Sequence, residues 1–173
     1  MTVLVAAALL TMGGAPLANP MVQMEIQGRG SMTIELYPEK APKTVAHFLD
    51  LVRKKFYDGV LFHRVQNKPR PFIVMTGDPL TKTVPLGDSR IGSGGSGKTV
   101  PFEKNDLAFV NGTLGLSRKK DNPNSGDSQF FITNGPQPFL EGTYVAFGRV
   151  VRGLEIIPKI ELGDKIASIR ETE

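Results

Sequence analysis

Short stretches of alternating apolar and polar residues dominate the chain and predict a β-rich fold. Residues 22–26 and 32–36 alternate in this way, and residues 27–30, with two glycines, supply a turn between them. This arrangement is typical of a β-hairpin. Further strand-like segments are expected at residues 60–65, 72–75, 107–110, 113–116, 129–133, 144–151 and 166–170.

Two helices interrupt the predicted strands. The first begins at Pro42, where a first helical turn tolerates proline, and Val45, Phe48, Leu49 and Val52 then follow at helical spacing. A second, shorter helix is expected over residues 154–160. Many short strands with a strand near each end of the domain favour a closed β-barrel, because closure leaves no strand edge exposed.

Composition narrows the possible chemistry. The 173 residues suffice for one domain with a sizeable core. Cysteine is absent, which excludes disulfides, thiolate nucleophiles and cysteine metal sites. The net charge is +4, but the basic residues are scattered, and the densest clusters, residues 53–55 and 118–120, are short. Solvated faces explain them, and we expect no nucleic-acid partner.

The first 20 residues differ from the rest. Residues 3–10 are an unbroken apolar run, and small residues follow up to Ala18, which resembles a secretory leader. The run is too short to span a bilayer, so we expect no stable membrane span. We predict a leader at 1–20, a folded domain at 21–173, and export to a periplasm or a plastid lumen. The alternatives are a loosely packed tail and a cytoplasmic protein.

One motif points to a different function. Residues 92–99, GSGGSGKT, match the phosphate-loop pattern G-x-x-x-x-G-K-T. In nucleotide hydrolases this loop follows a buried strand and opens a helix, whereas here no such strand precedes it and Pro101 follows. We therefore predict a surface loop and no nucleotide. The two histidines, His47 and His63, lack a recognisable metal-ligand spacing, so no metal is expected.

Several segments, in a fixed order from about residue 21 to 170, carry a family resemblance. They are TIELY at 33–37 with APKTVAHF at 41–48, FHRV at 62–65 followed by Phe72 and Gly77-Asp78, NSGDSQFFI at 124–132, and FLEGTYVAFG at 139–148. Together they are similar to the cyclophilins, a family of peptidyl-prolyl cis-trans isomerases. The resemblance implies a mainly β fold, a closed eight-stranded antiparallel barrel capped by two α-helices.

The resemblance also implies a substrate groove on the outside of the barrel. Arg64 is the implied catalytic arginine, and Gln129 bonds the substrate backbone. The implied substrate-binding residues are Phe72, Ile73, Met75, Ser117, Arg118, Phe131, Phe139, Leu140 and Tyr144. The implied partners are proline-containing peptides and folding protein clients, with a monomeric enzyme and no cofactor.

Such residues suit the reaction. Rotation about an X-Pro amide faces a barrier of ~18–20 kcal/mol but makes and breaks no covalent bond. A guanidinium aimed at the proline nitrogen stabilises the twisted transition state more than the planar amide. Met75 departs from the family pattern, which has glutamine there, so we expect Arg64 to be less well oriented. The alternative function is a proline-peptide binding scaffold with weak or no isomerase activity.

Overall fold

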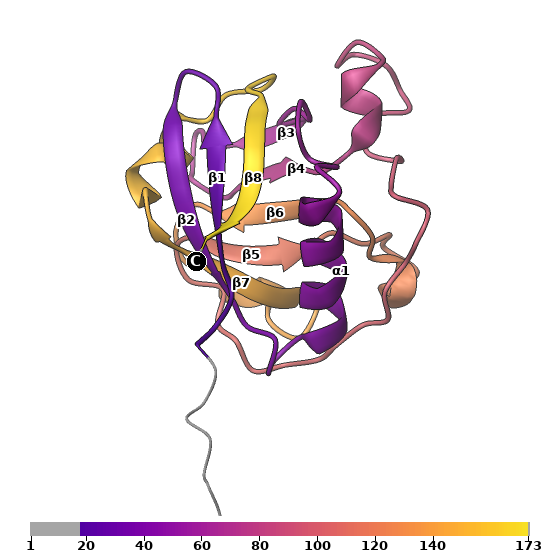
Figure 1. The fold of residues 1–173 in the computed structure, drawn as a ribbon, viewed down its shortest axis with the longest axis vertical. Helices are drawn as coiled ribbons and strands as arrows, with labels where there is room; N and C mark the ends of the chain where they lie inside the picture. Colours follow the sequence, from indigo (N-terminus) through magenta and orange to yellow (C-terminus); the bar gives the residue numbers. More distant parts are fainter. Residues whose placement is uncertain (1–17, 173) are drawn as a thin grey trace, which may run out of the picture.

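The structure, a computed structural model, describes residues 18–172 and forms one eight-stranded antiparallel sheet that curls around a core (Figure 1). Most of the predicted leader lies outside the described residues. The strand order is β3-β4-β6-β5-β7-β2-β1-β8. The strands are β1 (Met21–Ile26), β2 (Gly30–Leu36), β3 (Arg64–Gln66), β4 (Ile73–Thr76), β5 (Thr113–Leu116), β6 (Phe130–Thr133), β7 (Val145–Arg152) and β8 (Ile166–Thr172).

The predicted hairpin is confirmed, because β1 and β2 pair from Met21↔Glu35 to Ile26↔Gly30. β3 and β8 stand at the two ends of the strand order. The backbone just before β3 nevertheless reaches the start of β8. Phe62 N donates to Asp164 O at 2.8 Å, Gly59 N donates to Ile166 O at 2.8 Å, and Leu61 forms a bridge with Lys165.

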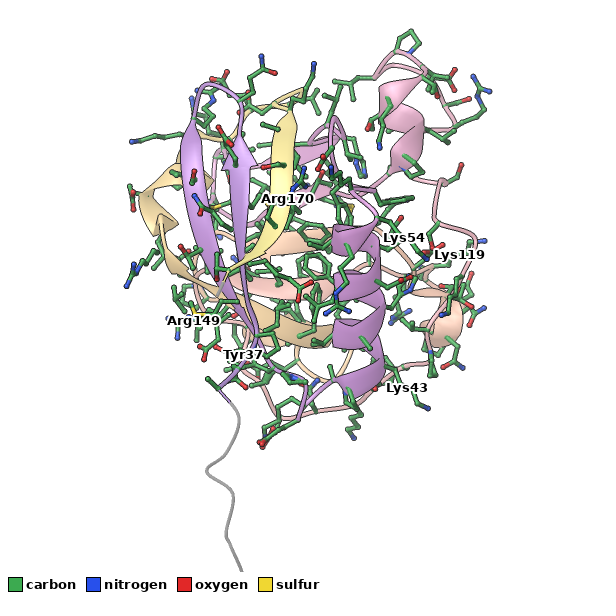
Figure 2. All side chains as sticks on the ribbon, viewed as in Figure 1. Tyr37, Lys43, Lys54, Lys119, Arg149 and Arg170 are labelled. Carbon is green, nitrogen blue, oxygen red and sulfur yellow. The ribbon has the colours of Figure 1, made fainter. Side chains whose placement is uncertain are left out.

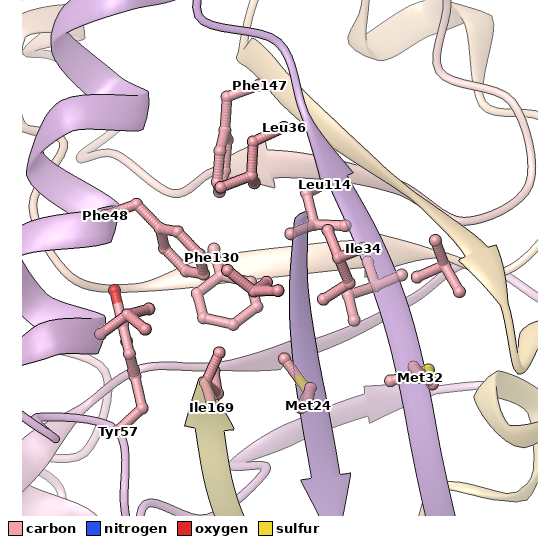
Figure 3. Packing of buried hydrophobic residues seen from close by; sticks show 14 of the residues in the cluster. Met24, Met32, Ile34, Leu36, Phe48, Tyr57, Leu114, Phe130, Phe147 and Ile169 are labelled. Carbon is pink, nitrogen blue, oxygen red and sulfur yellow. The ribbon is translucent and has the colours of Figure 1, made fainter. Parts of the chain in front are cut away.

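The first predicted helix is confirmed as α1 (Pro42–Arg53), with proline in its first turn. Its apolar face enters the core inside the curled sheet (Figure 3). Phe48 packs against Tyr57, Phe130 of β6 and Phe147 of β7, at ring-centroid distances of 5.3, 5.5 and 5.4 Å. The helix thereby covers one side of the core, and aromatic rings fill the space beneath it.

The second predicted α-helix is instead a 3₁₀-helix, η4 (Leu154–Lys159). Pro158 lies inside it and has no N–H to continue an α-helical ladder, which favours a short, tight helix. Ile156 and Ile157 still bury their side chains in the core. One α-helix and one 3₁₀-helix therefore stand where two α-helices were expected.

Two strand predictions need correction. Residues 60–63 are not strand residues, and β3 begins only at Arg64. The prediction for residues 107–110 is wrong, because their backbone bonds go to loops and side chains instead of to a neighbouring strand. Phe109 N donates to the Glu141 carboxylate at 3.3 Å, and Phe109 O accepts from Gln137 N at 2.7 Å.

Basic side chains are spread over several elements (Figure 2). Lys43 belongs to α1 and Lys54 caps its C-terminus, whereas Arg149 belongs to β7 and Arg170 to β8. Lys54 pairs with Asp50 at 2.8 Å, and Arg170 pairs with Asp58 at 2.6 Å. The charge is thus distributed and partly paired, in keeping with the scattered pattern in the sequence.

Candidate active site

The apolar residues form two clusters on opposite faces of the sheet. Alternation along β6 separates them, since Phe130 and Ile132 point into the main core while Phe131 points outward. The second, outer cluster contains Ile73, Phe109, Phe131, Leu140 and Ala146, with Phe72, Met75, Leu107 and Tyr144 packed against it. The predicted apolar residues of the substrate pocket are therefore gathered at one place outside the main core.

Strand register places the predicted catalytic arginine in line with this outer cluster. Arg64 of β3 lies opposite Met75 of β4, and Met75 lies opposite Phe131 of β6. Phe131 in turn lies opposite Gly115 of β5. Because paired residues project from the same face of a sheet, Arg64, Met75 and Phe131 form one row across the outside of the fold.

The Phe131 ring lies over Gly115. A Cβ on Gly115 would collide with this ring, so the absence of a side chain there leaves the space that the ring occupies. Phe109 stacks on Phe131 at 5.8 Å, and Tyr144 meets its edge at 5.3 Å. Phe131 is only 2% exposed, so the aromatic neighbours fix its orientation.

The rim of the cluster is more open. Phe139 is 65% exposed and packs against Phe72 at a centroid distance of 5.6 Å. Arg118 lies over the Tyr144 ring at 5.2 Å, and its Nε donates to Thr143 O at 3.0 Å. The predicted residues Phe72, Phe139, Arg118 and Tyr144 thus surround the outer cluster.

A groove of about 440 Å³ adjoins the row. Arg64, Met75, Ser117 and Gln129 line it, as do His63 and residues of the segment 86–92. The Arg64 side chain has no hydrogen bond or ion pair with any group in residues 18–172. Met75, directly opposite, offers only a weak acceptor, so it cannot hold the guanidinium as an amide would.

Gln129 connects this groove to a second one. The residue is 9% exposed, and its Nε2 donates to Gly94 O at 2.8 Å. The neighbouring cleft, about 490 Å³, shares Gly92, Ser117 and Gln129 with the first and is also lined by Arg118 and Lys119. All eleven predicted site residues consequently line the grooves or the outer cluster, or lie at their rim.

Sequence reasoning missed several residues of this region. Phe109 and Ala146 complete the outer cluster, and Leu86, Asp88 and Ile91 form a wall of the groove. Those last three lie between the short 3₁₀-helix η1 (Pro79–Lys82) and the glycine-rich segment. No motif in the sequence distinguishes this wall from an ordinary surface loop.

His63 is a half-buried titratable group next to Arg64. Burial lowers the pKa of His63 below the usual value of 6.5, and the opposing influence of Asp78 is smaller. The imidazole is therefore neutral at neutral pH, and Arg64 supplies the positive charge on this side of the groove.

This lowered pKa predicts a loss of stability in mild acid. Below about pH 6.5 the unfolded chain binds a proton at His63 that the folded chain does not, so the free energy of unfolding falls as the pH falls. Urea unfolding between about pH 7.5 and about pH 5.5 measures this slope. A His63→Gln variant should have a shallower slope, and an equal slope would contradict the assignment. Carboxylates with a lowered pKa, such as Asp58, make the free energy of unfolding depend on pH only below about pH 4, so they do not affect this measurement.

Within residues 18–172, no three His, Asp or Glu side chains are grouped as a metal site. In the same part of the chain, no helix has both the length and the apolar character required to cross a bilayer.

Comparison with known proteins identifies the family. The model for "Cyclophilin type peptidyl-prolyl cis-trans isomerase/CLD" matches residues 21–172, so the chain belongs to the cyclophilin family. It is 42% identical over 139 residues to a Brucella suis protein named "Probable peptidyl-prolyl cis-trans isomerase", covering 79% of this chain and 69% of the relative. It is 40% identical over 131 residues to an Arabidopsis thaliana peptidyl-prolyl cis-trans isomerase, covering 76% and 74%.

Solved structures of similar fold also belong to the cyclophilin family. A cyclophilin-type isomerase of Cryptosporidium parvum superposes with a TM-score of 0.77 at 27% identity, over 90% of this chain and 98% of the other. The structure of that protein in the presence of the dipeptide Ala-Pro gives a TM-score of 0.74 at 26% identity, over 88% and 99%. The chain is a cyclophilin-type peptidyl-prolyl cis-trans isomerase with a mainly β fold.

Proposed function

We propose that the groove beside Arg64 is where this isomerase accelerates rotation about X-Pro bonds. The observation that carries the proposal is the row across the sheet, which sets the Arg64 guanidinium beside an apolar cluster centred on Phe131. The Ala-Pro dipeptide used with the Cryptosporidium relative supports a proline-containing ligand for this chain as well. Phe131, Ile73 and Leu140 would hold the pyrrolidine ring through apolar contact.

The chemistry follows from the amide. As the X-Pro bond twists, resonance is lost and the proline nitrogen regains a lone pair. An N–H of Arg64 donates to that lone pair only in the twisted state, which lowers the barrier in both directions. The Gln129 amide oxygen accepts a backbone N–H of the peptide and fixes one side of the bond while the other rotates. No proton is transferred and no covalent bond changes.

A direct assay distinguishes a catalyst from the alternative binding scaffold. The cis-to-trans rate of an Ala-Pro peptide is measured in the presence of the protein and compared with the uncatalysed reaction, which takes tens to hundreds of seconds. Acceleration at low enzyme concentration supports catalysis at this site. Peptide binding without acceleration would support the scaffold instead.

Restoring the missing amide should raise activity. A Met75→Gln variant places an acceptor directly opposite Arg64, so we expect kcat/KM to rise by about threefold to tenfold, in line with one added hydrogen bond of about 1 kcal/mol. The assay is the Ala-Pro peptide rate, and Met75→Leu is the control without an acceptor. An unchanged kcat/KM in the glutamine variant would contradict the idea that Arg64 is poorly held.

The second cleft predicts a preference for acidic residues before the proline. Arg118 is fixed by backbone carbonyls, and Lys119 is exposed at the rim of the cleft. Asp127 also lines the cleft, but its carboxylate already accepts from Ser96 and Gly97. Peptides with Glu two residues before the proline should show about threefold higher kcat/KM than those with Lys at low salt, as for a surface charge pair. A Lys119→Glu variant should reverse the order, and no change in order would refute the preference.

We also infer that the curled sheet is a closed barrel. Its support is the bridge between Leu61 and Lys165 together with the backbone hydrogen bonds from residues 59–62 to residues 163–166. These contacts join the two ends of the strand order, and closure would remove both exposed edges.

We also propose that the protein is exported. The apolar run at residues 3–10 supports export, and an isomerase in an exported compartment would assist folding of clients there as a monomer. Fractionation of cells producing the full chain, with the N-terminus of the product sequenced, tests the leader. An uncleaved cytoplasmic product would refute it.

A further inference from the structure

The loop that matches the phosphate-binding pattern is held by a buried carboxylate. We call residues 92–97 the glycine loop. Asp78, which is completely buried, accepts the N–H of Gly92 at 2.5 Å and that of Gly94 at 3.3 Å through Oδ2. Its Oδ1 accepts from Leu80 N at 2.8 Å. Several charge-assisted hydrogen bonds thus hold the first half of the loop.

A second carboxylate holds the other end. Asp127 accepts from the Ser96 hydroxyl and, at 3.0 Å, from Gly97 N. His47 of α1 reaches the same carboxylate, with Nε2 3.2 Å from Oδ1. The far end of the glycine loop is therefore tied to β6 through the residues before Phe130 and to α1 through His47.

The glycines fit these carboxylates closely. A Cβ on Gly94 would overlap the Asp78 carboxylate, and one on Gly95 would overlap that of Asp127. Amide N–H groups at glycines often cradle anions, and here the anions are side chains of the protein itself. The resemblance to a nucleotide-binding loop therefore has a structural explanation that involves no nucleotide.

The middle of the glycine loop meets the active site. Gly94 O accepts a hydrogen bond from Gln129 Nε2 at 2.8 Å. A carbonyl oxygen can only accept, so it fixes the amide with its NH₂ group toward the loop. The amide oxygen is then the group left to accept an N–H from the substrate.

We propose that Asp78 and Asp127 are positioning residues for catalysis, acting through the glycine loop on Gln129. The inference rests on the proposed role of Gln129 in binding the substrate backbone. In this proposal both carboxylates act on catalysis through the loop, not as groups that react with the peptide. Each holds one side of the loop, and the loop sets both the position and the polarity of the Gln129 amide.

A double-mutant cycle tests the proposal. Asp78→Asn and Asp127→Asn are each made in the wild-type chain and in a Gln129→Ala chain, and kcat/KM is measured with an Ala-Pro peptide. In the wild-type background each substitution should lower kcat/KM by about fivefold to tenfold, because small displacements of an aligned group are costly. In the Gln129→Ala background the same substitutions should change kcat/KM by less than about twofold, because the group they position is gone.

Asp58→Asn is the matched control, since it breaks the ion pair with Arg170 of β8 and should lower the melting temperature without lowering kcat/KM. Equal losses in both backgrounds, or no loss in the wild-type background, would overturn the proposal. If Asp78→Asn does not fold, Asp127→Asn, whose side chain is 16% exposed, decides alone. A fully active Gln129→Ala variant overturns the role of Gln129 and this inference with it, whereas an inactive wild type would contradict the proposed catalysis itself.

Discussion

Replacing Arg64 with alanine should lower kcat/KM for an Ala-Pro peptide by about 10²–10³-fold, the range found when one preorganised transition-state donor is removed. Arg64 is exposed at the end of the outer row, and no other guanidinium or ammonium lies opposite Met75. The loss should fall mainly on kcat, since the bond to the proline nitrogen forms in the twisted state.

The same variant should remain folded. The Arg64 side chain makes no hydrogen bond within residues 18–172, so the free energy of unfolding should change by no more than about 0.5 kcal/mol. Arg70→Ala, at an exposed arginine in the loop between β3 and β4, is the matched control and should retain wild-type kcat/KM. Arg64→Lys keeps the charge but loses the planar fork, and should recover little activity. Comparable activity in the Arg64→Ala and wild-type proteins would show that catalysis lies elsewhere.

Alanine substitutions at the neighbouring residues Phe130 and Phe131 should have different effects, the first mainly on stability and the second mainly on activity. Phe130 is fully buried among Phe48, Tyr57 and Phe147, so Phe130→Ala should lower the free energy of unfolding by about 3–5 kcal/mol. That is a large part of the ~5–15 kcal/mol typical of a whole domain. The kcat/KM of the folded protein should change little, because the Phe130 side chain faces away from the groove.

Phe131→Ala should do the reverse. Phe131 belongs to the smaller outer cluster, so its removal should destabilise the fold less than the loss of Phe130. It also removes the ring at the centre of the proposed proline pocket, and we expect kcat/KM to fall by about 10²-fold, equivalent to losing roughly 2.7 kcal/mol of apolar contact with the substrate. Urea unfolding and the peptide assay on both variants provide the comparison. Equal effects of the two substitutions on both quantities would contradict the separation into inner and outer clusters.

Much of the fold could be predicted because its signals are local. Alternation in residues 22–36 specified the hairpin, and the spacing from Pro42 to Val52 specified α1. The failures have tertiary causes. Phe109 has the apolar surroundings of a strand residue, yet it packs on Phe131 and bonds through Glu141 and Gln137, which are distant in sequence. Nor does the pattern of residues 154–159 distinguish an α-helix from a 3₁₀-helix with an internal proline.

The site likewise has parts that the sequence predicts and parts that depend on tertiary contacts. Family-like segments pointed to Arg64, Gln129 and Phe131 as candidate site residues; the register places Arg64 and Phe131 in one row, and Gln129 lines the adjoining groove. The wall formed by Leu86, Asp88 and Ile91 escaped prediction because a loop has no periodic pattern. The partners of Asp78 and Asp127 escaped it as well, since hydrogen bonds from a carboxylate to distant backbone amides leave no mark on the spacing of residues.

The pairing of β1 with β8 has a consequence for how the chain folds during synthesis. Met21 lies opposite Thr172 and Met24 opposite Ile169, so the first strand of the domain must wait for the last one to leave the ribosome. Contacts between residues so far apart in sequence are slow to form, because the intervening chain must first be ordered. Until then the β1 edge that receives β8 is exposed, and a nascent isomerase passes through a stage in which it needs protection from aggregation itself.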